Sequence, residues 1–327
     1  MLYPLSYEGL HEGYLGVSGT FPSPSSSWGT SGAHAAEPIR SASSSIQSGT
    51  GGYIRRRDAK EPIQLFTGLS AFPLTPVSET DVDESPFFDL VARLDRAGVD
   101  SIGALGSTGS YAYLTREQRR RLAEVAVRAA GRTPVLVGIG GLRTVDVLRH
   151  AEDAQAGGAS AVLLAPMSYQ PLTDEEVYDL YADVTATLSV PLVVYDNPGT
   201  THFTFSDELH GRIAALPRVG SIKIPATPAD PQAARERVEQ LRARIPSHVT
   251  IGVSGDPAAA GGLLAGCDAW YSVLGGLWPQ ACLALTRAAQ RDDPDTASSI
   301  SDDLAPLWEL FGDYGSLRGL APVLARH

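Results

Sequence analysis

One lysine stands out as a residue that could attack a carbonyl group. The chain has 327 residues and 26 lysines plus arginines, of which only Lys60 and Lys223 are lysines. A lysine amine can lose its proton and act as a nucleophile, whereas a guanidinium stays charged in proteins. Lys223 ends the apolar run VGSIK, residues 219–223. A compositional bias toward arginine, or a strand-end lysine that snorkels to the surface, is the alternative interpretation.

A tyrosine ends another apolar run and could move protons. Tyr195 is the last residue of LVVY, and the turn DNPGTT follows at residues 196–201. A phenol at a strand end can serve as a proton shuttle. The alternative is an aromatic side chain that only closes a hydrophobic core.

A third candidate is the turn Gly106-Ser107-Thr108-Gly109-Ser110, which follows an apolar run and precedes a helical pattern. Hydroxyls and successive backbone N–H groups near a helix start favour anions. The turn therefore suits a carboxylate or a phosphate. An ordinary Gly/Ser turn with a helix cap remains the alternative.

Alternating strands and helices must position these residues. Short apolar runs predict eight strands, at Gln64–Ala71, Ser101–Leu105, Val135–Ile139, Ala161–Leu164, Leu192–Tyr195, Gly220–Lys223, Val249–Val253 and Ala269–Val273. Amphipathic stretches predict the intervening helices, at Ser85–Arg96, Arg116–Ala130, Val145–Ala156, Asp174–Leu188, Ser206–Leu216, Pro231–Ile245, Pro257–Ala265 and Pro279–Ala289. Eight such units predict an α/β fold, a (β/α)8 TIM barrel. A doubly wound open sheet is the rival, but AFPLTP follows the first strand where a glycine-rich dinucleotide turn would stand.

The barrel is flanked by two segments of different composition. Residues 1–61 are rich in Ser and Gly without a sustained apolar period, which predicts disorder. A transit peptide is the alternative for this segment. We assign residues 62–290 to the barrel and 291–327 to a C-terminal helical segment, with a helix expected at 295–315.

Composition excludes several classes of protein. The net charge of −11 argues against a general nucleic-acid binder, and no apolar run reaches the length of a membrane span. Two cysteines exclude a disulfide framework or a cysteine-rich zinc site, so we expect a cytoplasmic protein. The scattered histidines, including His150, His202, His210 and His248, predict no metal site.

The order of GSTG, YxNP and a strand-end IK resembles the dihydrodipicolinate synthase / N-acetylneuraminate lyase family, from about residue 62 to the C-terminus. The resemblance implies a (β/α)8 class I aldolase that holds pyruvate or another 2-oxo acid as a lysine Schiff base, without a further cofactor. It implies a homodimer or homotetramer. By this resemblance, Lys223 is the Schiff-base lysine and Tyr195 is the proton relay.

The same resemblance assigns residues to the substrate. Ser107 and Thr108, with the neighbouring Gly109, hold the carboxylate of the 2-oxo acid, and Thr108 belongs to the catalytic hydroxyl pair. Tyr271, in the run AWYSV, contacts the bound acid. The amine attacks the keto carbon, and the resulting iminium ion stabilises a carbanion at C3. Aldol addition, cleavage or dehydration can follow.

Several positions depart from the family pattern. Ser110 stands where an acidic residue is common, and Met167 and Ser168 stand where a tyrosine pair is usual, with Tyr169 one place later. Thr200, which we also place among the substrate-binding residues, stands where dihydrodipicolinate synthases carry an arginine for the second substrate's carboxylate. The pair Ile224-Pro225 follows the lysine and reshapes the pocket.

These departures leave the second substrate open. We predict a Schiff-base-forming lyase or aldolase that acts on a 2-oxo acid. Dihydrodipicolinate synthase activity proper and sugar-acid aldolase or dehydratase activity are alternatives within the class. A catalytically silent barrel that binds a small acid is an alternative outside it, against which the intact Lys223 and Tyr195 speak.

Overall fold

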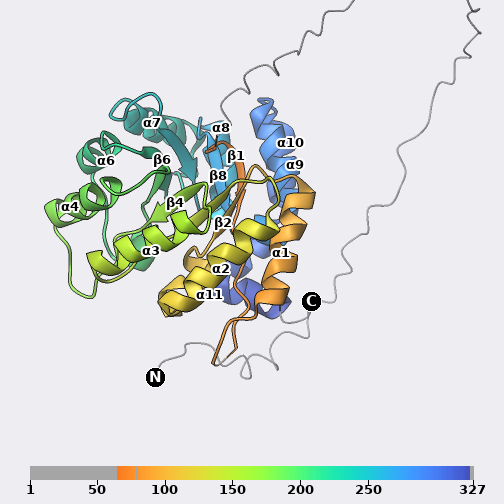
Figure 1. Cartoon of the computed structure of the whole chain (residues 1–327). Coiled ribbons are helices and arrows are strands. Elements are labelled where there is room, and N and C mark those ends of the chain that lie inside the picture. Colours follow the sequence, from red (N-terminus) through yellow and green to blue (C-terminus); the bar gives the residue numbers. More distant parts are fainter. Residues whose placement is uncertain (1–64, 79, 325–327) are drawn as a thin grey trace, which may run out of the picture. The chain divides into compact units, whose positions relative to one another are not determined.

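Eight parallel strands close into a barrel in sequence order in the computed structural model, which describes residues 65–78 and 80–324. Figure 1 shows the strands at the centre and the helices around them. The closed barrel confirms the predicted (β/α)8 fold and excludes the open sheet. The segment predicted to be disordered, residues 1–61, lies outside the described residues.

The strands are short and almost entirely buried, as expected for a parallel sheet covered by helices. They are β1 (Gly68–Ala71), β2 (Ser101–Ala104), β3 (Val135–Gly138), β4 (Ala161–Leu164), β5 (Leu192–Tyr195), β6 (Val219–Ile224), β7 (Thr250–Val253) and β8 (Ala269–Ser272). The prediction that the first strand begins at Gln64 is wrong by four residues. Residues 65–67 form a turn, and Gly68, the first residue of β1, has a left-handed φ of +73° at the point where the chain leaves this turn.

Helices follow the strands and cover the barrel. They are α1 (Glu84–Ala97), α2 (Arg116–Ala129), α3 (Thr144–Ala156), α4 (Asp174–Thr185), α5 (Pro198–Thr201), α6 (Asp207–Ala214), α7 (Pro231–Arg242), α8 (Ala259–Leu264), α9 (Pro279–Gln290), α10 (Pro294–Asp303) and α11 (Ala305–Leu324). Among the described helices, none is long and apolar enough to cross a bilayer.

The C-terminal region differs from the single helix expected at 295–315. It forms α10 and α11, and α11 continues to Leu324 across a kink at Gly315. Gly315 has φ +75° and ψ 153°, which no helical residue adopts, so the glycine bends the segment without ending it. The short helix α5 also went unpredicted, because four residues are too few for a periodic pattern.

Two aromatic rings fill the barrel interior. A Cβ on Gly103 would lie 2.3 Å from the Phe72 ring, and a Cβ on Gly252 would lie 2.2 Å from the Tyr271 ring. The two rings meet edge to face with 6.1 Å between their centroids. Glycine is therefore needed on β2 and β7 to make room for the rings, which close the barrel below its C-terminal end.

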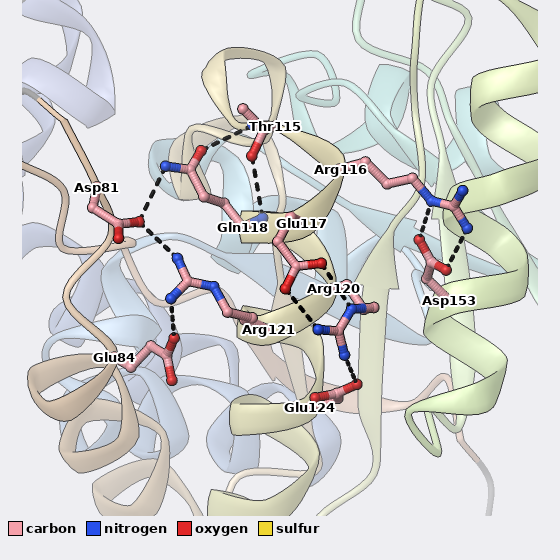
Figure 2. Close-up of polar contacts among 10 residues, drawn as sticks. All are labelled: Asp81, Glu84, Thr115, Arg116, Glu117, Gln118, Arg120, Arg121, Glu124 and Asp153. Carbon is pink, nitrogen blue, oxygen red and sulfur yellow. Dashed lines mark hydrogen bonds and ion pairs between the residues drawn. The ribbon is translucent and has the colours of Figure 1, made fainter.

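The start of α2 is fixed by polar contacts immediately after the Gly106–Ser110 turn (Figure 2). Thr115 and Gln118 form a reciprocal capping box, which satisfies two helix N–H groups. Arg121 reaches from α2 to Asp81 at 2.7 Å and to Glu84 at 2.9 Å. These contacts connect α2 to the start of α1 and so fix the position of the α2 N-terminus, which follows the turn.

Candidate active site

Lys223 lies inside the barrel near the C-terminal end of β6. It is 4% exposed and is paired in register with Tyr195 on the neighbouring strand β5. Its Nζ atom lies 4.2 Å from the centre of the Tyr195 ring, 4.3 Å from that of Phe72 and 5.6 Å from that of Tyr271. The lysine is therefore enclosed by aromatic faces, which attract its cation, and it does not snorkel to the surface.

The phenol of Tyr195 joins the turns that follow β2 and β5. Its oxygen accepts a hydrogen bond from the Asn197 side-chain amide at 2.9 Å, and the Ser107 hydroxyl donates to it at 3.5 Å. The ring itself is buried and packs beside Lys223. The Tyr195 ring thus packs in the core, as the structural interpretation expects. Its hydroxyl belongs to a polar cluster, as a proton shuttle requires.

The turn after β2 contains one turn of 3-10 helix, Ser107–Gly109. The Gly109 and Ser110 N–H groups donate to the Gly106 and Ser107 carbonyl oxygens, so the turn itself uses both amides. The side chains of Ser107 and Thr108 are half-buried. Of the predicted turn residues, Ser107 is the one that the structure joins to the Tyr195 phenol.

The backbone before this turn takes an unusual conformation. Leu105 has φ +57°, a left-handed value that is rare for a side chain other than glycine. Its carbonyl oxygen would lie 1.9 Å from a Cβ on Gly138, so this glycine of β3 allows the close approach. Left-handed conformations of this kind cluster at functional sites.

The two remaining predicted residues lie at different depths. Tyr271 is 1% exposed, and its hydroxyl lies 2.7 Å from the Ser221 hydroxyl, one layer below Lys223. Burial raises the pKa of the Tyr271 phenol well above its usual value. Thr200 is exposed on α5.

Sequence reasoning missed four residues around this cluster. Phe72 and Asn197 contact Lys223 and Tyr195 directly, and a polar residue in the NP turn was the available signal for Asn197. Behind β5, an Asp196 carboxylate oxygen lies 3.5 Å from Nε2 of His210. Both side chains are buried, and an acidic residue directly after Tyr195 was the only signal for this pair.

Burial shifts the ionisation of this pair. Desolvation raises the pKa of Asp196 to about 7, with Arg237 opposing the shift. Desolvation also lowers the pKa of His210 to about 4. His210 is fully buried and stacks on Phe205, with 4.9 Å between the ring centroids.

The loop after β4 carries three residues that depart from the family pattern or stand beside such a position, Met167, Ser168 and Tyr169, and Met167 packs against the hydrophobic core. The Ser168 hydroxyl donates to the Gln170 carbonyl oxygen at 2.5 Å and accepts from the Gln170 N–H group at 3.0 Å. Tyr169 is 92% exposed. The Ser168 side chain is therefore engaged locally, and the Tyr169 side chain is turned outward.

Comparisons with known proteins agree on one family. The model of the dihydrodipicolinate synthetase family matches residues 65–324. A 4-hydroxy-tetrahydrodipicolinate synthase of Phenylobacterium zucineum is 31% identical over 252 residues, which are 76% of this chain and 83% of that protein. A solved dihydrodipicolinate synthase from Agrobacterium tumefaciens is 48% identical, with a TM-score of 0.76 over 78% of this chain and 86% of that one.

A putative dihydrodipicolinate synthetase from Pseudomonas aeruginosa, also a solved structure, is 28% identical with a TM-score of 0.70. It covers 77% of this chain and 85% of its own. The resemblance inferred from the three sequence motifs is thus confirmed. The chain belongs to the dihydrodipicolinate synthetase family and is a lyase of the Schiff-base-forming, class I aldolase type.

Proposed function

We propose that the protein acts on pyruvate or a closely related 2-oxo acid, with Lys223 as the nucleophile and Tyr195 as the proton relay. The position of the Lys223 amine carries this proposal. It lies among three aromatic rings and beside the Tyr195 phenol, which joins two strand-end turns. Pyruvate is the acid we place first, because it has the smallest carbon skeleton that supports the chemistry.

The reaction begins when the neutral Lys223 amine attacks the keto carbon. A C–N bond forms, the keto oxygen takes up a proton, and the carbinolamine then loses water to give an iminium ion. Tyr195 is placed to give and accept these protons, because its ring borders the amine. Loss of a proton from C3 gives an enamine. Its C3 attacks the carbonyl carbon of a second substrate, or, in a longer 2-oxo acid, the enamine electrons form a C3=C4 bond while a leaving group departs from C4.

The pocket favours the charged intermediate. The faces of Phe72 and Tyr195 lie within 4.3 Å of the lysine nitrogen and can stabilise the iminium cation by cation–π attraction. We assign the acid's carboxylate to the hydroxyls of Ser107 and Thr108 in the turn after β2. The Ser107 hydroxyl, which donates to Tyr195 in this structure, would turn to the carboxylate when the acid binds and leave Asn197 as the donor to the phenol. Fixing the carboxylate would orient the keto carbon toward the amine.

The second substrate is the open part of the proposal. Thr200 cannot form the bidentate contact with a carboxylate that an arginine offers. We therefore place a hydroxylated partner, such as a sugar-acid fragment, ahead of a carboxylate-bearing aldehyde. Dihydrodipicolinate synthase activity remains the second candidate, because relatives at 31% and 48% identity carry that name.

We also propose that the chain forms homodimers or homotetramers through the rim beside β2, β3 and β4. Exposed side chains follow each of these neighbouring strands, Tyr113 at 55%, Leu142 at 65% and Tyr169 at 92%. Exposed apolar and aromatic groups on neighbouring loops are typical of protein interfaces. Sedimentation velocity of the wild type and a Tyr169→Ser variant tests this assembly.

Reductive trapping tests the proposed chemistry. The protein is mixed with pyruvate and sodium borohydride, and its intact mass is measured. We expect a gain of one reduced pyruvate that disappears in Lys223→Ala and persists in Lys60→Ala, the variant of the only other lysine. No adduct with pyruvate, 2-oxobutyrate or deoxy sugar acids, or an adduct that survives in Lys223→Ala, would refute the proposal.

A further inference from the structure

Asn197 is the only asparagine in the chain, and it lies two residues after Tyr195. It occupies the N-cap position of α5, where an asparagine side chain normally accepts a hydrogen bond from the helix backbone. Here the side chain makes no capping bond. Pro198 at the first helical position has no N–H group, and this lessens the need for a cap. The Asn197 amide can therefore form hydrogen bonds with groups outside the helix.

That amide bridges two turns of the active-site cluster. Its Nδ2 atom donates to the Tyr195 phenol oxygen at 2.9 Å and to the Ser107 hydroxyl oxygen at 3.4 Å. The Ser107 hydroxyl in turn donates to the same phenol oxygen at 3.5 Å. Asn197, Tyr195 and Ser107 thus form a closed triangle of polar groups at the ends of β2 and β5.

The direction of these bonds decides what the Tyr195 proton can do. An amide nitrogen only donates, and the Ser107 hydroxyl also donates, so the phenol oxygen acts as acceptor toward both neighbours. The phenol's own O–H is then not committed to either of them. The Tyr195 ring borders Lys223 at 4.2 Å, so this proton is available to a group bonded to the lysine nitrogen.

The nearby loop after β4 offers no competing donor from this chain. The hydroxyl of Ser168 is occupied by both backbone groups of Gln170, at 2.5 and 3.0 Å. Among the described residues, the Asn197 amide is therefore the hydrogen-bond donor closest to the Tyr195 phenol oxygen.

We propose that Asn197 is a positioning residue for the Tyr195 relay, and that its amide orients the phenol so that its O–H is delivered to the intermediate on Lys223. The inference rests on the proposed Schiff-base function. In the step concerned, Tyr195 gives its proton to the carbinolamine hydroxyl, which leaves as water while the nitrogen lone pair forms the C=N bond. A donor on the phenol oxygen also stabilises the phenolate that remains.

Pyruvate alone provides the test, because enamine formation exchanges its methyl hydrogens for deuterium in D2O. Proton NMR follows this exchange for the wild type, Asn197→Asp and Asn197→Leu. Both substitutions nearly preserve the side chain's size and remove the amide donor. We expect exchange to slow by about 10- to 100-fold, the effect of one hydrogen bond to a charged group. The equilibrium yield of trapped adduct should change little.

The pH profile separates positioning from a purely structural role. When its introduced carboxyl is protonated, Asn197→Asp regains an O–H donor at the same place. The rate of this variant relative to wild type should therefore rise as pH falls from about 8 to about 5, toward the carboxyl's titration range. Asn197→Leu has no group to protonate, so its relative rate should stay constant. Equal pH profiles for the two variants, or unchanged exchange in both, would overturn the inference.

A second measurement applies even if a variant fails to fold. Labelling wild type with ¹⁵N-asparagine gives one pair of side-chain amide signals, because the chain has one asparagine. Tyr195→Phe should shift that pair, and Ser168→Ala should not. An unmoved pair in Tyr195→Phe would refute the contact. Wild type that neither exchanges nor traps pyruvate would instead refute the proposed function, and the labelling result would still decide the contact.

Discussion

Lys223 and Tyr195 are paired in register on β6 and β5, and the lysine nitrogen lies 4.2 Å from the centre of the tyrosine ring. Side chains alternate between the two faces of a strand, so this register places both inside the barrel. Asp196, the next residue, faces outward to His210 on α6. At the end of β5, Tyr195 thus points into the barrel, whereas Asp196 forms a buried ionisable pair with His210 in the surrounding helix layer.

Removing only the phenol oxygen of Tyr195 should separate its proton chemistry from its packing. Tyr195→Phe keeps the ring beside Lys223, and we expect pyruvate methyl exchange to fall by about 100- to 10,000-fold, the range of general acid–base catalysis. The matched control is Tyr181→Phe, whose hydroxyl bonds main-chain groups, the Leu164 carbonyl at 2.6 Å and the Tyr195 backbone, so this variant keeps the Tyr195 phenol itself. That control should lower stability and leave exchange within a few-fold. Equal losses in both variants would contradict the relay.

The sequence predicted the Lys223 site because unusual residue types coincide with strand ends. The only lysine of residues 62–327, in a chain that otherwise uses arginine, and a tyrosine after an apolar run can both be recognised without any structure. Phe72 was not predicted, because a phenylalanine after a strand looks like any core residue. Its position opposite Gly103 depends on the closure of the barrel, which joins β1 to both β2 and β8. Asn197 was missed because its type and place predict a helix cap.

Boundaries were predicted less well where local conformation overrides apolar character. The left-handed Gly68 shortens β1, and the kink at Gly315 lets α11 continue where a glycine suggested an end. Neither φ value can be read from composition, since glycine adopts both signs of φ with similar ease.

Because the Phe72 and Tyr271 rings fill the barrel interior, a single added methyl group next to them should lower the stability of the protein. In Gly252→Ala, the new Cβ would lie 2.2 Å from the Tyr271 ring, which the bond to Ser221 restrains. We expect a loss of about 1–3 kcal/mol in the free energy of unfolding, as for other overpacked cores. Chemical denaturation measures it.

Gly261→Ala is the control for this substitution. Gly261 lies within α8, and a methyl group added there would meet no atom within 4 Å, so alanine should stabilise the helix by up to about 1 kcal/mol. Loss of stability in both variants would show that the contact with the Tyr271 ring is not the cause.

The buried Asp196 predicts a specific dependence of stability on pH. Its pKa is raised to about 7 in the folded state, from about 3.9 in an unfolded chain. Its contribution to stability is therefore fully present below about pH 4 and is lost as pH rises to about 7. Asp196→Asn removes this loss. The free energy of unfolding of the variant, relative to that of wild type, should therefore increase as pH rises, by about 1–4 kcal/mol at pH 8.

Thermal or urea unfolding at several pH values checks this gain. The lowered pKa of His210 acts in the opposite sense, since its contribution is lost as pH falls from about 6.5 to about 4. Comparing the variant with wild type at each pH isolates the effect of the carboxyl group. Asp183→Asn, at an exposed position of α4, is the control for the loss of one carboxylate and should not reproduce the gain of Asp196→Asn. A flat difference for Asp196→Asn would refute the prediction.

An ion pair at the opposite end of the barrel should affect stability without affecting chemistry. Both Asp100 oxygens accept from Arg287 at 2.9 Å, and one also accepts the Leu69 N–H group at 2.7 Å. Asp100 directly precedes β2, so the pair lies at the N-terminal face, which in such barrels serves stability. Asp100→Ala should lower the free energy of unfolding by about 1–3 kcal/mol, because it leaves a buried N–H group unpaired.

The same variant should trap pyruvate at a rate within about twofold of wild type, because the C-terminal face carries the chemistry. Arg120→Ala provides the contrast on α2 (Figure 2), where Arg120 pairs with the exposed Glu117 and Glu124. Exposed pairs contribute about 0–1 kcal/mol, so this variant should be nearly as stable as wild type. Urea unfolding and the borohydride trap measure both quantities on the same samples. A large drop in trapping rate for Asp100→Ala with intact folding would show that the two ends of the barrel are coupled.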